Sequence, residues 1–181
     1  MDTATTYDAA SRPLTAVLEA VPRAAWSEPS PCEGWTATDV LRHLVETQRE
    51  LFAGHGVDLG EVPDVDADPV QAWRTHAARV LDVLADAAVA AIAYDGFFGP
   101  TTLGATLEQF YVWDMVVHRW DVAQAAGLAA GLTDAELDRL DRGADSFGDA
   151  LYTEGICRSG VTAPSGAGRE STVLARLGRA A

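Results

Sequence analysis

The sequence predicts an all-α protein, most simply a four-helix bundle with an additional C-terminal helix. Apolar residues recur three and four positions apart in successive segments, which is the spacing of one helix face. In addition, no stretch of six residues alternates apolar and polar positions with turn residues around it. Strand signals are therefore nearly absent.

The first two helices are predicted from a proline and a capping motif. Pro13 fits only the first turn of a helix or else kinks it, so helix one is expected to begin near Ser11. Thr36 opens a Thr-Ala-Thr-Asp capping box, and the apolar period that follows ends at Gly54. Helix two is therefore expected over about residues 37–53.

Two further helices follow, separated by a loop. Asp68 and Pro69 supply an N-cap and a first-turn proline for a long third helix, which is expected to reach about Ala93. Residues 96–104 are rich in glycine and proline and are expected to form a loop. The fourth helix should then span residues 103–126.

The C-terminal part of the chain is predicted to hold one more helix. A second capping box, at residues 133–136, begins a fifth helix that should complete a bundle over about residues 5–152. Residues 153–181 are rich in glycine and are expected to form an irregular tail, apart from a last turn at residues 173–177.

The charge of the chain bears on its partners. The formal net charge is −14, the pI is near 4.4, and the 13 Lys and Arg residues are scattered along the sequence. Binding to nucleic acid draws on clustered basic residues, so DNA and RNA are excluded as expected partners. At 181 residues the chain can bury a core without a metal, so any bound metal is expected to be functional rather than structural.

The sequence lacks membrane-helix, signal-peptide and paired-cysteine motifs, and this bears on where the protein lies and on the redox state of its cysteines. No apolar run approaches the roughly 20 residues of a membrane helix, and the N-terminus lacks the basic and apolar regions of a signal peptide. We expect a cytoplasmic location and no membrane partner. Cys32 and Cys157 form no Cys-x-x-Cys motif, so neither a zinc ribbon nor a redox pair is indicated and both thiols are expected to be reduced.

Three ionisable residues share the apolar face of the predicted fourth helix: Asp114, His118 and Asp121. Burying an unpaired charge costs several kcal/mol, so these groups must pair with each other or bind something. Asp114 and His118 lie one turn apart and can ligate the same metal ion. A buried ion pair without metal is the alternative.

A third ligand must come from another helix, and the remaining histidines are the candidates. His43 lies two turns into helix two and is the best of them, although a hydrogen-bonded histidine at a helix boundary explains it equally well. His55, between two glycines, is expected to be a solvated loop residue. His76 is expected to be an ordinary packed or surface histidine.

Asp121, Cys32 and Trp35 are also expected to have roles in or near the site or in the core. Asp121 can orient the His118 imidazole or line a substrate pocket, or it can contact an arginine such as Arg119. Cys32 is expected to be a buried structural cysteine, with contact to the pocket as the alternative. Trp35 is expected to be an anchor packed on the core.

These motifs together resemble a known family. The segments that carry the resemblance keep their order along nearly the whole chain: residues 31–36, Pro-Cys-Glu-Gly-Trp-Thr; residues 43–45, His-Leu-Val; residues 114–123, Asp-Met-Val-Val-His-Arg-Trp-Asp-Val-Ala; and residues 174–179, Leu-Ala-Arg-Leu-Gly-Arg. They resemble the actinobacterial metal-binding proteins of the DinB-like superfamily. More narrowly, they are similar to the N-terminal domain of mycothiol-dependent maleylpyruvate isomerase.

The resemblance implies a fold and a metal site. It implies a single DinB-like metal-binding domain over residues 1–181, built as a four-helix bundle around a divalent ion, Zn²⁺ in the usual case and Ni²⁺ as an alternative. Carried over by position, the ligands are His43, Asp114 and His118. The isomerase has Glu at the position of Asp114. Asp114 is a ligand shorter than that Glu by one methylene.

The resemblance also implies a reaction class. It indicates an S-transferase or isomerase in which the metal activates mycothiol, or another low-molecular-weight thiol, toward a small electrophile. The alternatives are a non-catalytic module that binds metal or a small ligand, and a metal-dependent hydrolase. Since bundles of this type often pair, a homodimer is a further expectation.

Overall fold

The computed structural model describes residues 2–153 and 157–180, and these residues are mostly helical, in agreement with the predicted all-α class. The chain divides into two compact units, residues 1–130 and residues 131–181. A small two-stranded sheet accompanies the helices of the first unit. Within the described part of the chain, no helix has the length and apolarity that crossing a bilayer requires.

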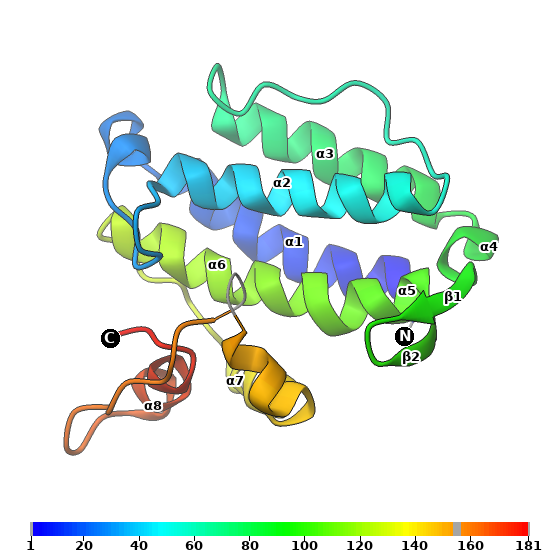
Figure 1. Cartoon of the computed structure of the whole chain (residues 1–181). Coiled ribbons are helices and arrows are strands. Elements are labelled where there is room, and N and C mark those ends of the chain that lie inside the picture. The colour runs from blue at the N-terminus through cyan, green and yellow to red at the C-terminus, as the bar shows by residue number, and fades with distance from the viewer. Residues whose placement is uncertain (1, 154–156, 181) are drawn as a thin grey trace. The chain divides into compact units, whose positions relative to one another are not determined.

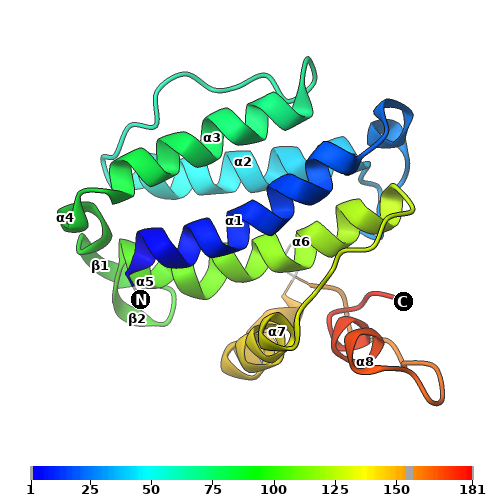
Figure 2. The same cartoon turned by 180° about the vertical axis from the view of Figure 1, so that it is seen from behind.

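The long helices of the first unit lie alongside one another (Figures 1 and 2). Helix α1 contacts α3 and α6, and α2 contacts the same two helices. The elements of this unit are α1 (Thr3–Ala20), the 3₁₀ turn η1 (Arg23–Ser27), α2 (Ala37–Gly54), α3 (Pro69–Leu84), α4 (Ala87–Ala90), β1 (Ala93–Gly96), β2 (Gly99–Thr102), α5 (Leu103–Thr106), the π-helical η2 (Leu107–Tyr111) and α6 (Val112–Ala125).

Helix α2 confirms its prediction closely. Thr36 accepts a hydrogen bond from the backbone N–H of Asp39, and the Asp39 carboxylate accepts one from the backbone N–H of Thr36, so the capping box is complete. The helix then continues to Gly54 with an apolar face in which Val40, Leu41 and other residues are fully buried. This rigid start fixes the position of the residues in the next two turns.

Helix α1 begins eight residues earlier than expected, at Thr3 instead of Ser11, and Pro13 lies inside it. Asp2 caps this helix, since its carboxylate accepts a hydrogen bond of 2.7 Å from the backbone N–H of Thr5. Residues before the proline, such as Tyr7, are fully buried. Packing of this early stretch therefore outweighs the helix-breaking tendency of proline, which costs about 3 kcal/mol in isolation.

The third predicted helix was too long, and a β-hairpin at residues 93–102 overlaps the loop predicted at residues 96–104. Helix α3 ends at Leu84, and the short α4 leads into β1. Strand β1 pairs antiparallel with β2, with Ala93 opposite Thr102 and Gly96 opposite Gly99. The backbone of Gly99 has φ 106°, which only glycine adopts readily, so the tight turn depends on that residue.

The fourth predicted helix is interrupted by a π-helical turn at Leu107–Tyr111. Such a turn adds a residue to the helical repeat, so residues before it are rotated relative to those after it. In α6, residues 112–123 are all buried except Asp114, which is half-buried. The single apolar stripe predicted for this helix was therefore wrong, because α6 is covered on most sides.

The second unit contains α7 (Asp134–Phe147), the 3₁₀ turn η3 (Gly148–Tyr152) and α8 (Arg169–Arg176). The predicted capping box is present, but the helix ends earlier than expected, at Phe147, and the next residue, Gly148, has φ 53°. The predicted irregular tail is corrected by α8, which is longer than the expected last turn. Arg176 on α8 holds α7 through Asp141 and Asp145, at 2.9 and 2.6 Å.

A buried polar cluster lies inside the first unit, formed by Tyr7, Gln48 and His76. Tyr7 donates a hydrogen bond of 2.8 Å to Gln48 Oε1, and His76 Nε2 lies 3.0 Å from the same oxygen. Burial, and then repulsion from Arg49, lowers the pKa of His76 to about 3. His76 is thus a packed histidine, as predicted, and it is neutral in the fold.

Candidate metal centre

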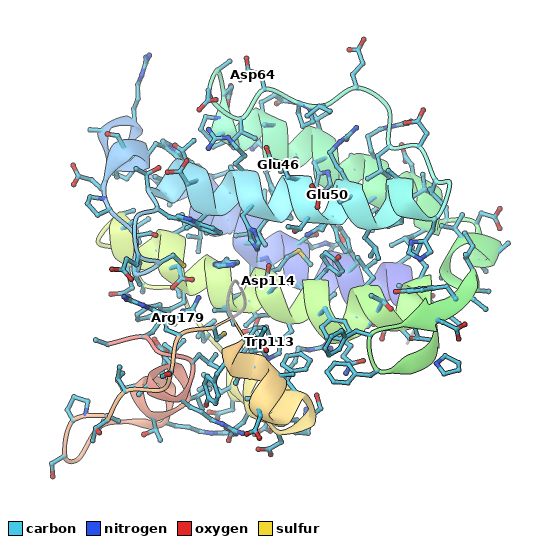
Figure 3. The ribbon with its side chains drawn as sticks, viewed as in Figure 1. Glu46, Glu50, Asp64, Trp113, Asp114 and Arg179 are labelled. Carbon is cyan, nitrogen blue, oxygen red and sulfur yellow. The ribbon has the colours of Figure 1, made fainter. Side chains whose placement is uncertain are left out.

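Helices α2 and α6 bring His43, Asp114 and His118 together. His43 Nε2 lies 3.2 Å from Asp114 Oδ2, and His118 Nε2 lies 3.2 Å from Asp114 Oδ1. Figure 3 shows Asp114 on the part of α6 that borders α2. The imidazole of His43 meets that of His118 edge to face, with ring centroids 5.2 Å apart.

The chemistry and exposure of this cluster suit a divalent metal ion. One ligand atom from each of the three residues lies within 4.8 Å of the other two. Two imidazole nitrogens and a carboxylate oxygen are the donors that zinc and nickel accept. The side chains of His43 and Asp114 are 28% and 24% exposed, so an ion can reach them from solvent. The residues present therefore fit the metal that the resemblance implies.

The contacts inside the cluster shift two pKa values. Burial by itself would raise the pKa of Asp114, but attraction to His118 and hydrogen bonds from His118 and His43 outweigh it and lower that pKa. For His118, burial would lower the pKa, whereas attraction to Asp114 and the hydrogen bonds that link His118 to Asp114, Asp121 and Cys32 raise it well above 6.5. In the metal-free protein His118 therefore holds a proton at neutral pH.

Asp121 contacts the other nitrogen of the same imidazole. His118 Nδ1 donates a hydrogen bond of 2.8 Å to Asp121 Oδ2, and the Asp121 side chain is completely buried. This is the geometry in which a carboxylate orients a ligating histidine. Of the interpretations of Asp121, the structure shows the contact with His118.

Cys32 and Trp35 reach the cluster from the loop before α2. The thiol of Cys32 donates a hydrogen bond of 3.3 Å to Asp121 Oδ2 and lies 3.9 Å from His118 Nδ1. Cys32 is half-buried and touches the site, so its prediction as a buried structural cysteine is corrected. Trp35 is 36% exposed and its ring lies 5.0 Å from that of His43, so it covers the site and does not anchor the core.

The sequence contained a signal for these two residues. Both lie in the segment directly before the capping box of α2, and the hairpin-like bridge between Pro29 and Thr36 folds that segment back toward the helix that carries His43. A loop that immediately precedes a ligand-bearing helix is the place to look for residues that line the same site.

Two glutamates and a tyrosine lie near the cluster. Glu46 and Glu50 are exposed on α2, three and seven residues beyond His43, and therefore on the same side of that helix (Figure 3). Burial raises the pKa of Tyr111 to about 12, with Tyr94, Asp114 and Glu50 contributing. Tyr111 thus keeps its hydroxyl proton near Asp114.

The two other histidines lie apart from these ligand sets. His55 is half-buried at the end of α2, where its Nδ1 lies 2.7 Å from the carbonyl oxygen of Leu51 and its ring lies 4.0 Å from that of Tyr94. The prediction of a solvated loop residue was therefore wrong. His76 belongs to the buried polar cluster of the first unit.

Comparison with known families supports the resemblance stated from the motifs. Neither the curated proteins nor the solved structures give a significant match to the chain. The matching family model covers α2 and most of α1, and so includes Cys32, Trp35 and His43. Residues 7–54 are similar to the mycothiol maleylpyruvate isomerase N-terminal domain, which confirms over that stretch the resemblance that the motifs indicated.

Proposed function

We propose that the first unit is a DinB-like four-helix bundle of α1, α2, α3 and α6, in which His43, Asp114 and His118 hold a divalent metal ion. Zn²⁺ is the expected ion and Ni²⁺ the alternative. The protein uses mycothiol, or another low-molecular-weight thiol, as cosubstrate. It acts as a thiol-dependent S-transferase or isomerase on a small electrophile.

One observation carries the proposal: two separate helices bring two imidazoles and a carboxylate within ligand distance of one another at a place that solvent reaches. A structural site would be closed, whereas three protein ligands leave room for a further ligand. The match of residues 7–54 to a mycothiol-related domain supports a thiol as that ligand. A bound divalent ion would supply the positive charge that converts a thiol to a thiolate near neutral pH.

The residues around the ligands would each have a separate role. Asp121 holds the ring of His118 through Nδ1, so that Nε2 stays aimed at the shared centre. Trp35 lies against the imidazoles of His43 and His118 and forms part of the wall of the site. Tyr111 keeps a hydroxyl proton that can be donated to an oxygen of the substrate.

The charge near the site favours a neutral or cationic electrophile. Glu46 and Glu50 lie on the same side of α2 as His43, and the whole chain carries a net charge of −14. Their negative potential repels anionic substrates and attracts cations. Monobromobimane is a suitable neutral probe, because alkylation of a thiol by it releases bromide and a proton and yields a fluorescent thioether.

We expect the metal-loaded protein to accelerate the conjugation of mycothiol with monobromobimane at least tenfold over the same mixture without protein. The reaction is followed by fluorescence, with the metal-free protein and the His43→Ala variant as controls. Acceleration should disappear in both controls. Equal rates with and without the metal-loaded protein would rule out catalysis and leave only a metal-binding module.

The pKa of His118 predicts how metal affinity depends on pH. An ion at Nε2 must displace a proton that Asp114 and Asp121 stabilise, and the raised pKa of His118 means that this proton is still bound at neutral pH. Apparent affinity should therefore increase as the pH rises toward and through neutrality, by at most about tenfold per pH unit for one displaced proton. Competition with a chromophoric chelator measures this dependence, and a flat profile would contradict it.

A further inference from the structure

The ring of His118 lies between two groups of metal-binding side chains, one at each nitrogen. Its Nε2 faces Asp114 at 3.2 Å, in the cluster described above. Its Nδ1 faces Asp121 Oδ2 at 2.8 Å and Cys32 Sγ at 3.9 Å, and those two atoms are 3.3 Å apart. A nitrogen, an oxygen and a sulfur donor therefore surround one point on the far side of the ring.

The spacing of these three donors is close to that of tetrahedral coordination. At the bond lengths of Zn²⁺, about 2.0–2.3 Å, tetrahedral angles separate the ligand atoms by roughly 3.3–3.7 Å. The observed separations, 2.8, 3.3 and 3.9 Å, lie on both sides of that range. Each separation lies within about 0.5 Å of that range.

The backbone holds Cys32 in place for this role. Its N–H donates a hydrogen bond of 3.2 Å to the hydroxyl of Ser30, and its carbonyl accepts one of 3.0 Å from the N–H of Trp35. Asp121 is completely buried, whereas Cys32 is half-buried. The thiol is thus fixed against a buried carboxylate and an imidazole, on the side from which an ion can enter.

We propose that Cys32, Asp121 and His118 Nδ1 form a second metal site, which binds thiophilic divalent ions such as Cd²⁺. Coordination transfers the thiol proton of Cys32 to solvent and leaves a thiolate ligand. The first cluster offers only nitrogen and oxygen, so the sulfur gives the second site a different metal preference. This inference does not depend on the proposed thiol chemistry.

The two sites share His118 and therefore exclude each other. A neutral imidazole has a lone pair on only one of its nitrogens. When Nδ1 binds an ion, Nε2 carries the ring proton and donates it to Asp114, which already lies 3.2 Å away. One ion is bound per chain, and the kind of metal decides which face of His118 it occupies.

The test is a titration of metal-free, untagged full-length protein with cadmium chloride. The ultraviolet absorption of the thiolate-to-cadmium charge transfer is recorded after each addition. In the wild type the absorption should increase until one equivalent of cadmium per chain has been added and then stay constant. It should be lost in Cys32→Ser, which keeps the size of the side chain, and retained in Cys157→Ser, which removes the other thiol. It should also be retained in His43→Ala, because only the first cluster uses that residue.

A second measurement uses only the wild type, so its result does not depend on whether a variant folds. Cadmium should slow the alkylation of Cys32 by iodoacetamide at least tenfold, read by peptide mass spectrometry, while Cys157 serves as the internal reference. An absorption that persists in Cys32→Ser, one that vanishes in His43→Ala, or equal alkylation of Cys32 with and without cadmium would overturn the second site. Binding of two equivalents would overturn the sharing of His118.

The same experiment separates this inference from the proposed function. Cadmium absorption that depends on Cys32 supports the second site even when the protein fails to accelerate thiol conjugation. Conversely, zinc-dependent conjugation without a cadmium–Cys32 signal supports the first site alone.

Discussion

Replacing His43 by alanine is expected to abolish stoichiometric binding of Zn²⁺ or Ni²⁺. The variant removes one of three donors, and because even residues that only support a ligand contribute 10- to 100-fold to affinity, we expect a loss of about 100-fold or more. The imidazole of His43 is 28% exposed and lies on a helix that its own capping box stabilises, so helical circular dichroism should stay unchanged. Elemental analysis of the untagged protein and equilibrium dialysis measure the loss.

The chain offers a matched control for this experiment. His55 lies at the end of the same helix and belongs to neither candidate cluster, so His55→Ala should bind metal as the wild type does. His118→Ala should also abolish binding, but with a larger loss of stability, because it removes the hydrogen bond to the completely buried Asp121. Retained metal in His43→Ala, or unfolding of the wild type by a chelator, would contradict the assignment.

The second large effect is a dependence of stability on pH that comes from His76. Its pKa is about 3 in the fold and about 6.5 in the unfolded chain, so the unfolded state binds more protons between these values. The contribution of His76 to stability should therefore be complete above about pH 6.5 and fall as the pH decreases. Each unit costs up to about 1.4 kcal/mol, so this contribution to the free energy of unfolding should drop by about 3 kcal/mol between pH 6.5 and pH 4.

Urea denaturation of the metal-free protein at several pH values tests this expectation. Carboxylates of the unfolded chain begin to take up protons below about pH 5, and Asp114, whose pKa is lowered in the fold, then loses its stabilising contribution, so the slope that belongs to His76 is read between about pH 5 and pH 6.5. His76→Leu should flatten the profile, since Gln48 keeps the hydrogen bond from Tyr7. His55→Gln serves as a control that retains the slope, and an unchanged slope in His76→Leu would assign the effect to other groups.

Local chemistry was predictable from sequence where one short motif determines the backbone. The start of α2 at the Thr36 capping box and the start of α3 at Asp68 and Pro69 both appear as expected. In each case a side chain satisfies a backbone N–H only a few residues away, so no distant contact is needed. The end of α3 was less predictable, since this helix stops at Leu84 and not near Ala93.

Elements that depend on distant packing were missed. Helix α1 continues through Pro13 because the residues before it are buried against other helices, which the local preference of proline does not report. The π-helical turn at Leu107–Tyr111 likewise has no local marker in the sequence. The β-hairpin was overlooked because its strands have only four residues each, too few for an alternating pattern.

The sequence by itself determined which helices carry the candidate ligands, because Asp114 and His118 are one turn apart and a capping box sets the phase of His43. Only the tertiary structure decided that Cys32 and Trp35 lie against the same imidazoles. Spacing along one helix is a local property that periodicity reports. The path of a loop depends on how distant helices pack, so contacts such as that between Cys32 and Asp121 emerge only when the chain is folded.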